Sequence, residues 1–551
     1  MTRADLLSLL PELILCAGGV LILLLDAVAP GLRRAWTAVG LLVTAAAAWG
    51  AWQAWASLGG ASGDPSFVVK TCNGMLETSR VTFAFSVVIL VATGLCLLAS
   101  DSYLRRERIL GGEYHALLLW CATGMLLMLR ATELLTIFLA LELLSISLYS
   151  LAAYHRRVSI AVEAAIKYFL MGAFVSAFVL FGIALVYGAT GSTRLEVVER
   201  ALVAGQGTAV ATIGLLLLVC GFGFKMALAP FHAWSPDTYQ GAPSPFVAFL
   251  SVAPKVASAL VLYRLLEVAA QTAGPIAARW VSVVGLLSAL SMVVGNLLAL
   301  AQTDIKRMLA YSGVAHMGYL LLALVTFDRA SLAPIAVYLL AYVLMNAGAF
   351  AVVSLLYGRP GARHEIEELA GWGYRYPLLG GCLAICMLSL GGIPPTMGFL
   401  GKYLVFQQAV ATGHVRLAVL GELVDLVADA ADAELAELGE VLADLGGGQV
   451  VAPRQLLRRD ACQTQLLELA QAAQVEGEAV QGERGDLLRL ARVAVLDAAL
   501  VYLAPVAAIS HCSRSAGQRP STRVASAAIT AAARPQASTS SPSGCRLSGR
   551  M

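Results

Sequence analysis

Apolar segments of about 20 residues recur along this chain, and short polar breaks separate them. A helix needs about 20 predominantly apolar residues to cross the hydrocarbon core of a bilayer. Of the 551 residues, 59% are hydrophobic and 13% are charged, whereas a soluble domain carries roughly 25% charged residues. The pattern therefore predicts an all-α polytopic membrane protein with about 13–14 transmembrane helices and argues against a soluble enzyme.

The chain divides into five regions by composition. Twelve spans fit between residues 5 and 411, and the first is too long for a cleaved signal segment. A weaker thirteenth span covers 413–430, and a marginal last one covers 493–510. The predicted regions are 1–113 with the first three helices, 114–266, 276–420, a charged region 421–510, and a Ser-, Pro- and Arg-rich tail 511–551 that is typical of disorder.

Basic residues are unevenly distributed between the polar breaks. Arg33-Arg34, Arg105-Arg106, Arg156-Arg157 and Lys306-Arg307 follow odd-numbered spans, whereas the even-numbered breaks are sparser or balanced by acids. Cytoplasmic loops carry an excess of Lys and Arg. We therefore expect the N-terminus outside the cytoplasm, and Lys306-Arg307 as a basic flank of its span.

Only six of the 38 basic residues are lysines. Lys225, Lys255 and Lys402 lie within apolar segments, where a basic group costs about 2.5–3.5 kcal/mol on insertion scales. Arginine stays protonated in proteins, whereas a desolvated lysine can release its proton near neutral pH. These three amines are predicted to gain and lose protons. Snorkelling of Lys225 and Lys255 to the membrane surface is the alternative.

Four further titratable groups lie in apolar segments. Glu142 is in the middle of a span, His316 lies inside another, and Glu163 and Lys167 are four residues apart near the start of a third. Residues four apart share one face of a helix, and an acid–amine pair in a membrane can share or pass a proton. A structural role stays open for each: a hydrogen-bonded carboxyl, a structural ion pair or a satisfied core histidine.

Two spans, five helices apart, contain helix-breaking residues. The seventh span runs through Lys225 into Pro230, and the twelfth contains two glycines and two prolines between Gly391 and Pro395, followed by Lys402. Proline removes a backbone donor and clashes with the preceding turn, so helices 7 and 12 are predicted to be broken. Corresponding breaks indicate two five-helix repeats, and because five is odd the second copy is inverted. Broken helices leave polar room for water, which conducts protons.

The sequence contains no recognisable redox or nucleotide-binding motif. A Walker lysine, a dinucleotide fingerprint and an iron–sulfur cysteine run are all missing, and the ten cysteines form no C-x-x-C pair. No basic patch indicates nucleic-acid binding. We therefore expect no cofactor and no metal on this chain, and the driving energy to come from another subunit or from an ion gradient.

Five segments carry a resemblance to a known family. They are LELLSISLYSLAAY (141–154), EAAIKYFLMGAF (163–174), FKMALAPFHAWSPDTYQGAPSPFVAFLSVAPK (224–255), GNLLALAQTDIKRMLAYSGVAHMGYLL (295–321) and SLGGIPPTMGFLGKYLVF (389–406). Over roughly residues 5–420 the chain resembles the antiporter-like membrane subunits of respiratory complex I, which are related to subunits of multisubunit Na+/H+ antiporters.

The resemblance implies a role for each buried group. Glu142 and Lys225 would form the first key pair, Lys255 would connect it onward, and Lys402 would be the terminal proton-exchanging lysine. The pair at 163 and 167 matches charged positions of the family's sixth helix.

The resemblance also implies a proton-translocating subunit of NADH–quinone oxidoreductase in the bacterial inner membrane. Its partners would be other membrane-arm subunits, and flavin, iron–sulfur centres, NADH and quinone would belong to other subunits. Two alternatives stay open: a subunit of a cation/proton antiporter, and a non-pumping structural subunit. Beyond Leu420 the family pattern is lost, and the absence of lysine from there on suggests a shifted reading frame as one hypothesis.

Overall fold

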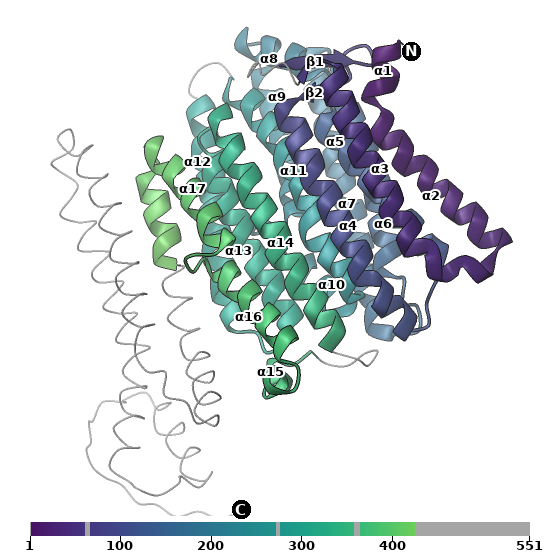
Figure 1. Cartoon of the computed structure of the whole chain (residues 1–551). Coiled ribbons are helices and arrows are strands. Elements are labelled where there is room, and N and C mark those ends of the chain that lie inside the picture. The colour runs from purple at the N-terminus through teal and green to yellow at the C-terminus, as the bar shows by residue number, and fades with distance from the viewer. Residues whose placement is uncertain (1, 61–66, 272–275, 357–363, 425–551) are drawn as a thin grey trace, which may run out of the picture. The chain divides into compact units, whose positions relative to one another are not determined.

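Long apolar helices lie side by side in a computed structural model, which describes residues 2–60, 67–271, 276–356 and 364–424 (Figure 1). In hydrocarbon every backbone N–H and C=O must be satisfied within the protein, and a helix achieves this by itself. Ten of the described helices are long and apolar enough to cross a membrane. The prediction of an all-α polytopic membrane protein is therefore confirmed.

The elements of the first half follow one another in short order. They are α1 (Arg3–Ser8), α2 (Leu10–Val28), the 3-10 helix η1 (Pro30–Ala35), α3 (Trp36–Ser57), β1 (Val68–Thr71), β2 (Leu76–Ser79), α4 (Arg80–Arg106), α5 (Gly112–Arg130), α6 (Leu134–Ala152), α7 (Ser159–Thr190), α8 (Leu195–Val203), α9 (Thr208–Met226) and α10 (Trp234–Gly241).

The second half continues in the same way. Its elements are α11 (Ser244–Ala270), α12 (Ile276–Leu300), α13 (Ile305–Leu324), the 3-10 helix η3 (Arg329–Ser331), α14 (Leu332–Leu356), the 3-10 helix η4 (Ile366–Leu369), α15 (Trp372–Arg375), α16 (Pro377–Gly391) and α17 (Met397–Ala411).

Twelve spans were expected up to residue 411. Eleven of them correspond to a single long helix or to a helix with a break, and the twelfth corresponds to two shorter helices, α16 and α17. Helix α13 is not among the ten most apolar spans, in keeping with its charged start at Lys306 and Arg307. The expected thirteenth span begins as a helix at residue 415, which continues to 424. Its remainder, the last span and the tail 511–551 lie outside the described residues.

A small β-hairpin between α3 and α4 was not predicted. Strands β1 and β2 pair antiparallel, with Val68 opposite Ser79 and Thr71 opposite Leu76. The connecting turn holds Asn73 and Gly74 with positive φ, which is the geometry that Asn-Gly favours in hairpins. An isolated bridge from Leu76 to Ala131 attaches the hairpin to the end of α5. The hairpin therefore marks one end of the helix bundle.

Helix α11 lies at the centre of this bundle. The most apolar stretch of this helix is entirely buried, and the helix packs against α4, α5, α9 and α14. Proline 254 stands inside it, directly before Lys255. Since proline lacks the backbone donor, one carbonyl of the preceding turn loses its helical partner here. The sequence thus places Lys255 in the most deeply buried helix of the described chain.

Both predicted breaks are present. Helix α9 ends at Met226, where Ala227 takes a left-handed conformation (φ 58°), and α10 begins only at Trp234. Helix α16 ends at Gly391, where Gly392 is left-handed (φ 78°), and α17 begins after Thr396. The inverted relation between the two five-helix repeats, and the regional boundaries at 113, 266 and 420, stay predictions.

Candidate functional site

Lys225 is the first buried amine of the candidate site. It is the penultimate residue of α9, only 3% exposed. Its Nζ donates to Ser145 Oγ of α6 at 2.7 Å and lies 5.4 Å and 5.9 Å from the ring centroids of Tyr149 and Tyr168. Two aromatic faces and one hydroxyl thus surround the amine. Snorkelling to the membrane surface is excluded for this lysine.

Glu142 lies on the same face of α6, three residues before Ser145. Its Oε1 is buried and has no hydrogen-bond partner among the described residues. No ion pair within 4.0 Å joins it to Lys225 in the part of the chain that the structure describes. Among the described residues, Ser145 is therefore the hydrogen-bond partner of the Lys225 amine on α6, and sequence reasoning missed it. Its position one turn after Glu142 was the available signal.

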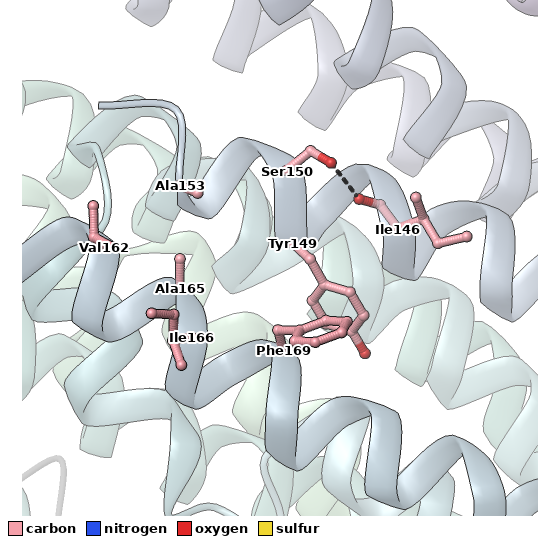
Figure 2. A pocket seen from close by; sticks show the side chains of 8 residues that line it. All are labelled: Ile146, Tyr149, Ser150, Ala153, Val162, Ala165, Ile166 and Phe169. Carbon is pink, nitrogen blue, oxygen red and sulfur yellow. Dashed lines mark hydrogen bonds between the residues drawn. The ribbon is translucent and has the colours of Figure 1, made fainter. Parts of the chain in front are cut away.

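Tyr149 also lines an apolar groove between α6 and α7, with a volume of about 350 Å³. Figure 2 shows Tyr149 and Phe169 projecting from neighbouring helices at this groove, and their ring centroids are 5.5 Å apart with nearly perpendicular planes. Among the described residues that line this groove, Tyr149 is the one whose ring also lies against Lys225 Nζ.

Lys255 is the second buried amine and is 1% exposed. Its Nζ donates to Gly313 O and to Tyr342 Oη, both at 3.2 Å. A Cβ atom at Gly313 would lie 2.7 Å from this Nζ and 2.9 Å from the Tyr342 hydroxyl. The glycine thus leaves the space that the lysine occupies. Snorkelling is excluded here as well.

His316 is buried on α13, one turn from Gly313. Its Nδ1 shares a hydrogen bond of 2.6 Å with the hydroxyl of Tyr338, and the ring of Tyr342 lies 5.2 Å away. The Tyr342 ring also lies 5.5 Å from Lys255 Nζ, and the Tyr319 ring lies 5.9 Å from the His316 ring and 4.9 Å from Lys402 Nζ. The histidine therefore lies between the second and third amines.

Lys402 is the third amine, on α17 just beyond the second break. Its Nζ donates to Gly391 O at 3.3 Å and lies 4.9 Å from the centroid of the Tyr319 ring. A Cβ at Gly392 would lie 2.9 Å from Cδ of this lysine, and the residue is left-handed. Gly392 thus allows the left-handed turn at the break and leaves space for Lys402, whose side chain reaches back to the end of α16.

The tyrosines of this region were not anticipated. Tyr338, Tyr342 and Asn346 are spaced four residues apart on α14, and Asn346 donates to Tyr342 Oη at 3.2 Å. A polar stripe at helical spacing within an otherwise apolar segment was the sequence signal for them.

Glu163 and Lys167 do not join the buried groups. They form an ion pair of 2.8 Å near the start of α7, with side chains 64% and 44% exposed. Lys167 also donates to Asp237 of α10 at 3.0 Å. The structure thus places this pair apart from the buried amines, on the accessible first turns of α7 after Ser159, and its role in proton transfer stays a prediction.

Lys306 does more than flank its span. It is 2% exposed and donates to Gln240 O and Ala242 O, at the C-terminal end of α10. His364 lies outside the membrane-spanning helices. Its burial, together with the nearby charge of Lys306, lowers its pKa to about 3. The basic flank is thus partly an internal helix cap.

Among the described residues, no group of three or more His, Cys, Asp or Glu side chains could hold a metal ion. The buried site consists instead of amines, hydroxyls, one histidine and one carboxyl. Such groups can accept and release protons, which makes the arrangement suitable for proton transfer.

Residues 131–426 match the family described as NADH:quinone oxidoreductase/Mrp antiporter, transmembrane. The matched segment therefore includes the buried titratable residues described above: Glu142, Lys225, Lys255, His316 and Lys402. A chain of respiratory complex I from Thermus thermophilus has 37% sequence identity and a TM-score of 0.64, over 76% of this chain and 87% of that one. A chain of the Mrp complex from Dietzia shares the fold, with 22% identity and a TM-score of 0.66 over 78% of this chain and 79% of that one.

Curated relatives narrow the assignment. NADH-quinone oxidoreductase subunit N of Trichlorobacter lovleyi is 39% identical over 75% of this chain and 83% of the relative. The same subunit of Geobacter metallireducens is 42% identical over 77% of this chain and 86% of the relative. The chain belongs to the family of NADH-quinone oxidoreductase subunit N. It is a multi-pass membrane protein and a subunit of a translocase complex.

Proposed function

We propose that this subunit carries protons through the membrane along Glu142, Lys225, Lys255, His316 and Lys402, while electron transfer to quinone takes place on other subunits. The observation that supports this most directly is the pair of fully buried lysines, Lys225 and Lys255. Neither has a carboxylate within 4.0 Å among the described residues. An amine held by neutral acceptors can lose its proton without leaving an unpaired carboxylate behind.

The groups follow the packing order of the helices. Ser145 of α6, one turn after Glu142, bonds to Lys225 of α9. Helix α9 packs on α11, α11 packs on α13 and α14, and both of these pack on α17. A proton on Lys225 Nζ is held by Ser145, a proton on Lys255 Nζ by Gly313 and Tyr342, and a proton on Lys402 Nζ by Gly391. His316 lies between the last two sites.

In this proposal the coupling is electrostatic. A change of charge on Glu142 alters the balance at Lys225, and each later amine responds to its neighbour. The broken helices supply polar room beside Lys225 and Lys402. The N-terminus is proposed to lie outside the cytoplasm, because basic clusters follow the odd-numbered spans. Flavin, iron–sulfur centres and the quinone site are proposed to lie on other subunits.

Replacement of Lys225 provides the test. Lys225→Arg keeps a positive charge but cannot release its proton near neutral pH, and Lys225→Ala removes the amine. In proteoliposomes containing the purified complex, both variants should lower proton uptake per NADH oxidised, while native gels show an assembled complex. Lys70→Ala is the matched control, because this lysine pairs with Glu196 on the surface.

Three results would contradict the proposal or redirect it. Normal pumping by the assembled Lys225→Arg and Lys225→Ala complexes would refute it. Loss of assembly with normal pumping by what remains would favour a structural subunit. A strict requirement for sodium ions would favour cation/proton antiport.

A further inference from the structure

Four charged side chains form a network that connects the three helices α7, α10 and α13. Asp237 of α10 is its centre, with Oδ1 accepting from Arg307 of α13 at 2.7 Å and Oδ2 accepting from Lys167 of α7 at 3.0 Å. Lys167 in turn pairs with Glu163 at 2.8 Å. We refer to Glu163, Lys167, Asp237 and Arg307 as the α7–α10–α13 network.

The end of α10 is attached to the start of α13 by further contacts. Lys306 donates to the carbonyls of Gln240 and Ala242 at 3.0 and 2.8 Å, and Gln240 Nε2 donates to Asp304 Oδ2 at 3.2 Å. A cation is favourable at a helix C-terminus, where backbone carbonyls are unpaired. A displacement of α10 along its axis is therefore transmitted to residues 304–307.

The other end of α10 contacts the surroundings of Lys225. Trp234, its first residue, donates from Nε1 to Phe224 O at 2.8 Å, directly before Lys225. The Trp234 ring stacks on Tyr168 with centroids 4.7 Å apart, and the same Tyr168 ring lies 5.9 Å from Lys225 Nζ. Tyr168 adjoins Lys167 in the sequence. Helices α7 and α10 thus both connect the network to the first amine.

Helix α13 connects the network to the later groups. It begins at Ile305 and carries Arg307, then Gly313, whose carbonyl accepts from Lys255, and then His316. A rigid helix moves these residues together. The network therefore joins the element that surrounds Lys225 to the element that holds Lys255 and His316.

We propose that the Asp237–Arg307 ion pair is a positioning pair that couples the Lys225 site to the Lys255–His316 site. The inference rests on the proposed function. The side chains are 37% and 26% exposed, so their attraction is moderate and adjustable rather than locked. Asp237 has two cationic partners and Lys167 has two acidic ones. If the ion pair loosens, Asp237 therefore keeps Lys167, and Arg307 keeps the neutral acceptors Gln302 and Gln240.

The test compares single and reversed charges in the assembled complex. Asp237→Asn and Arg307→Gln should each lower the number of protons translocated per NADH by about two- to fivefold, the range expected for loss of a partly exposed coupling contact. The double variant with Asp237→Arg and Arg307→Asp should restore part of that loss. Arg307→Lys keeps the charge but not the fork that reaches Asp237 and Gln240, so a smaller loss is expected.

The matched control is the ion pair of Arg329 with Glu267, at 2.9 Å and outside the network. Arg329→Gln and Glu267→Gln should leave protons per NADH unchanged. The coupling role is wrong if the network variants also translocate the normal number of protons per NADH, whether or not less complex assembles. If the Asp237→Asn complex does not assemble, the number of protons translocated per NADH by the Arg307→Lys complex is the test instead. A normal number would then refute the coupling role.

Failure of this inference is distinguishable from failure of the proposed function. If Lys225→Arg abolishes pumping while the network variants pump normally, only the coupling role is refuted. If Lys225→Arg pumps normally, the proposed function itself is refuted.

Discussion

Gly313→Ala should block proton transfer through Lys255 while leaving the fold intact. The added methyl would lie 2.7 Å from Lys255 Nζ and 2.9 Å from the Tyr342 hydroxyl. The end of the Lys255 side chain is flexible and can move aside, whereas the Tyr342 ring is fully buried and can shift only slightly. Alanine is also the better helix former, by about 1 kcal/mol relative to glycine. This gain offsets part of the cost of displacing the Lys255 amine, so the free energy of unfolding should fall by no more than about 2 kcal/mol.

The local cost falls on the amine. Moving Lys255 aside removes its hydrogen bond to Gly313 O, and a hydrogen bond to a charged group contributes about 1.5–3 kcal/mol. If the barrier to proton transfer rises by the same amount, transfer slows by about 10- to 150-fold. We expect an assembled complex with strongly reduced proton uptake.

The assay is proton uptake by proteoliposomes, normalised to assembled complex, with thermal unfolding measured in parallel. Gly94→Ala is the control, because a Cβ there meets no atom within 4 Å. Unchanged uptake in Gly313→Ala would show that the position of the Lys255 amine does not matter for pumping. A large fall in unfolding temperature would show that the packing argument is wrong.

Three further predictions concern other sites. Ser145→Ala removes the 2.7 Å hydrogen bond to Lys225 and should slow pumping by about tenfold or more, since such a bond contributes about 1.5–3 kcal/mol; pumping by the purified variant checks this, and normal rates would contradict it. Arg130→Ala leaves Glu12 buried without its 2.6 Å partner and should destabilise the subunit by about 3–5 kcal/mol; its thermal unfolding temperature measures the loss. The pKa of His364 is lowered to about 3 from the ordinary 6.5, so the unfolded chain binds more protons between these pH values and the stability of the fold falls as pH drops below about 6.5. His364→Gln should flatten the dependence of unfolding temperature on pH between 7 and 5. An unchanged slope would exclude this histidine as the source of that dependence.

The sequence predicted the buried amines because charge in hydrocarbon is expensive. A lysine within an apolar segment needs a specific environment, so Lys225, Lys255 and Lys402 could be selected without coordinates. The breaks at the seventh and twelfth spans were predictable for a similar reason, since proline and paired glycines cannot continue a helix. Both predictions depend only on local chemistry.

The partners of these amines were not predictable in this way. Gly313 is 58 residues from Lys255, and Tyr342 is 87 residues away. An isolated glycine or tyrosine in an apolar segment does not indicate which helix it faces. The exposed setting of Glu163 was missed for a related reason: the start of the apolar run did not show how much of the first turns stays outside the bundle.

The structure separates permanent charges from those proposed to change. At the hairpin end, Arg130 donates to Glu12, Ser8 and Thr78, an arrangement in which an arginine and a carboxylate hold each other charged. In the bundle centre, Lys225 and Lys255 donate to a serine, a carbonyl and a tyrosine. Breaking a buried ion pair costs about 3–5 kcal/mol because a charge remains unpaired, whereas deprotonating an amine beside neutral acceptors leaves no such charge. A proton carrier needs amines that can lose their proton, and lysines with neutral partners provide these at the centre of the bundle. It also needs a stable fold around them, and an arginine paired with an acid contributes to this at the hairpin end.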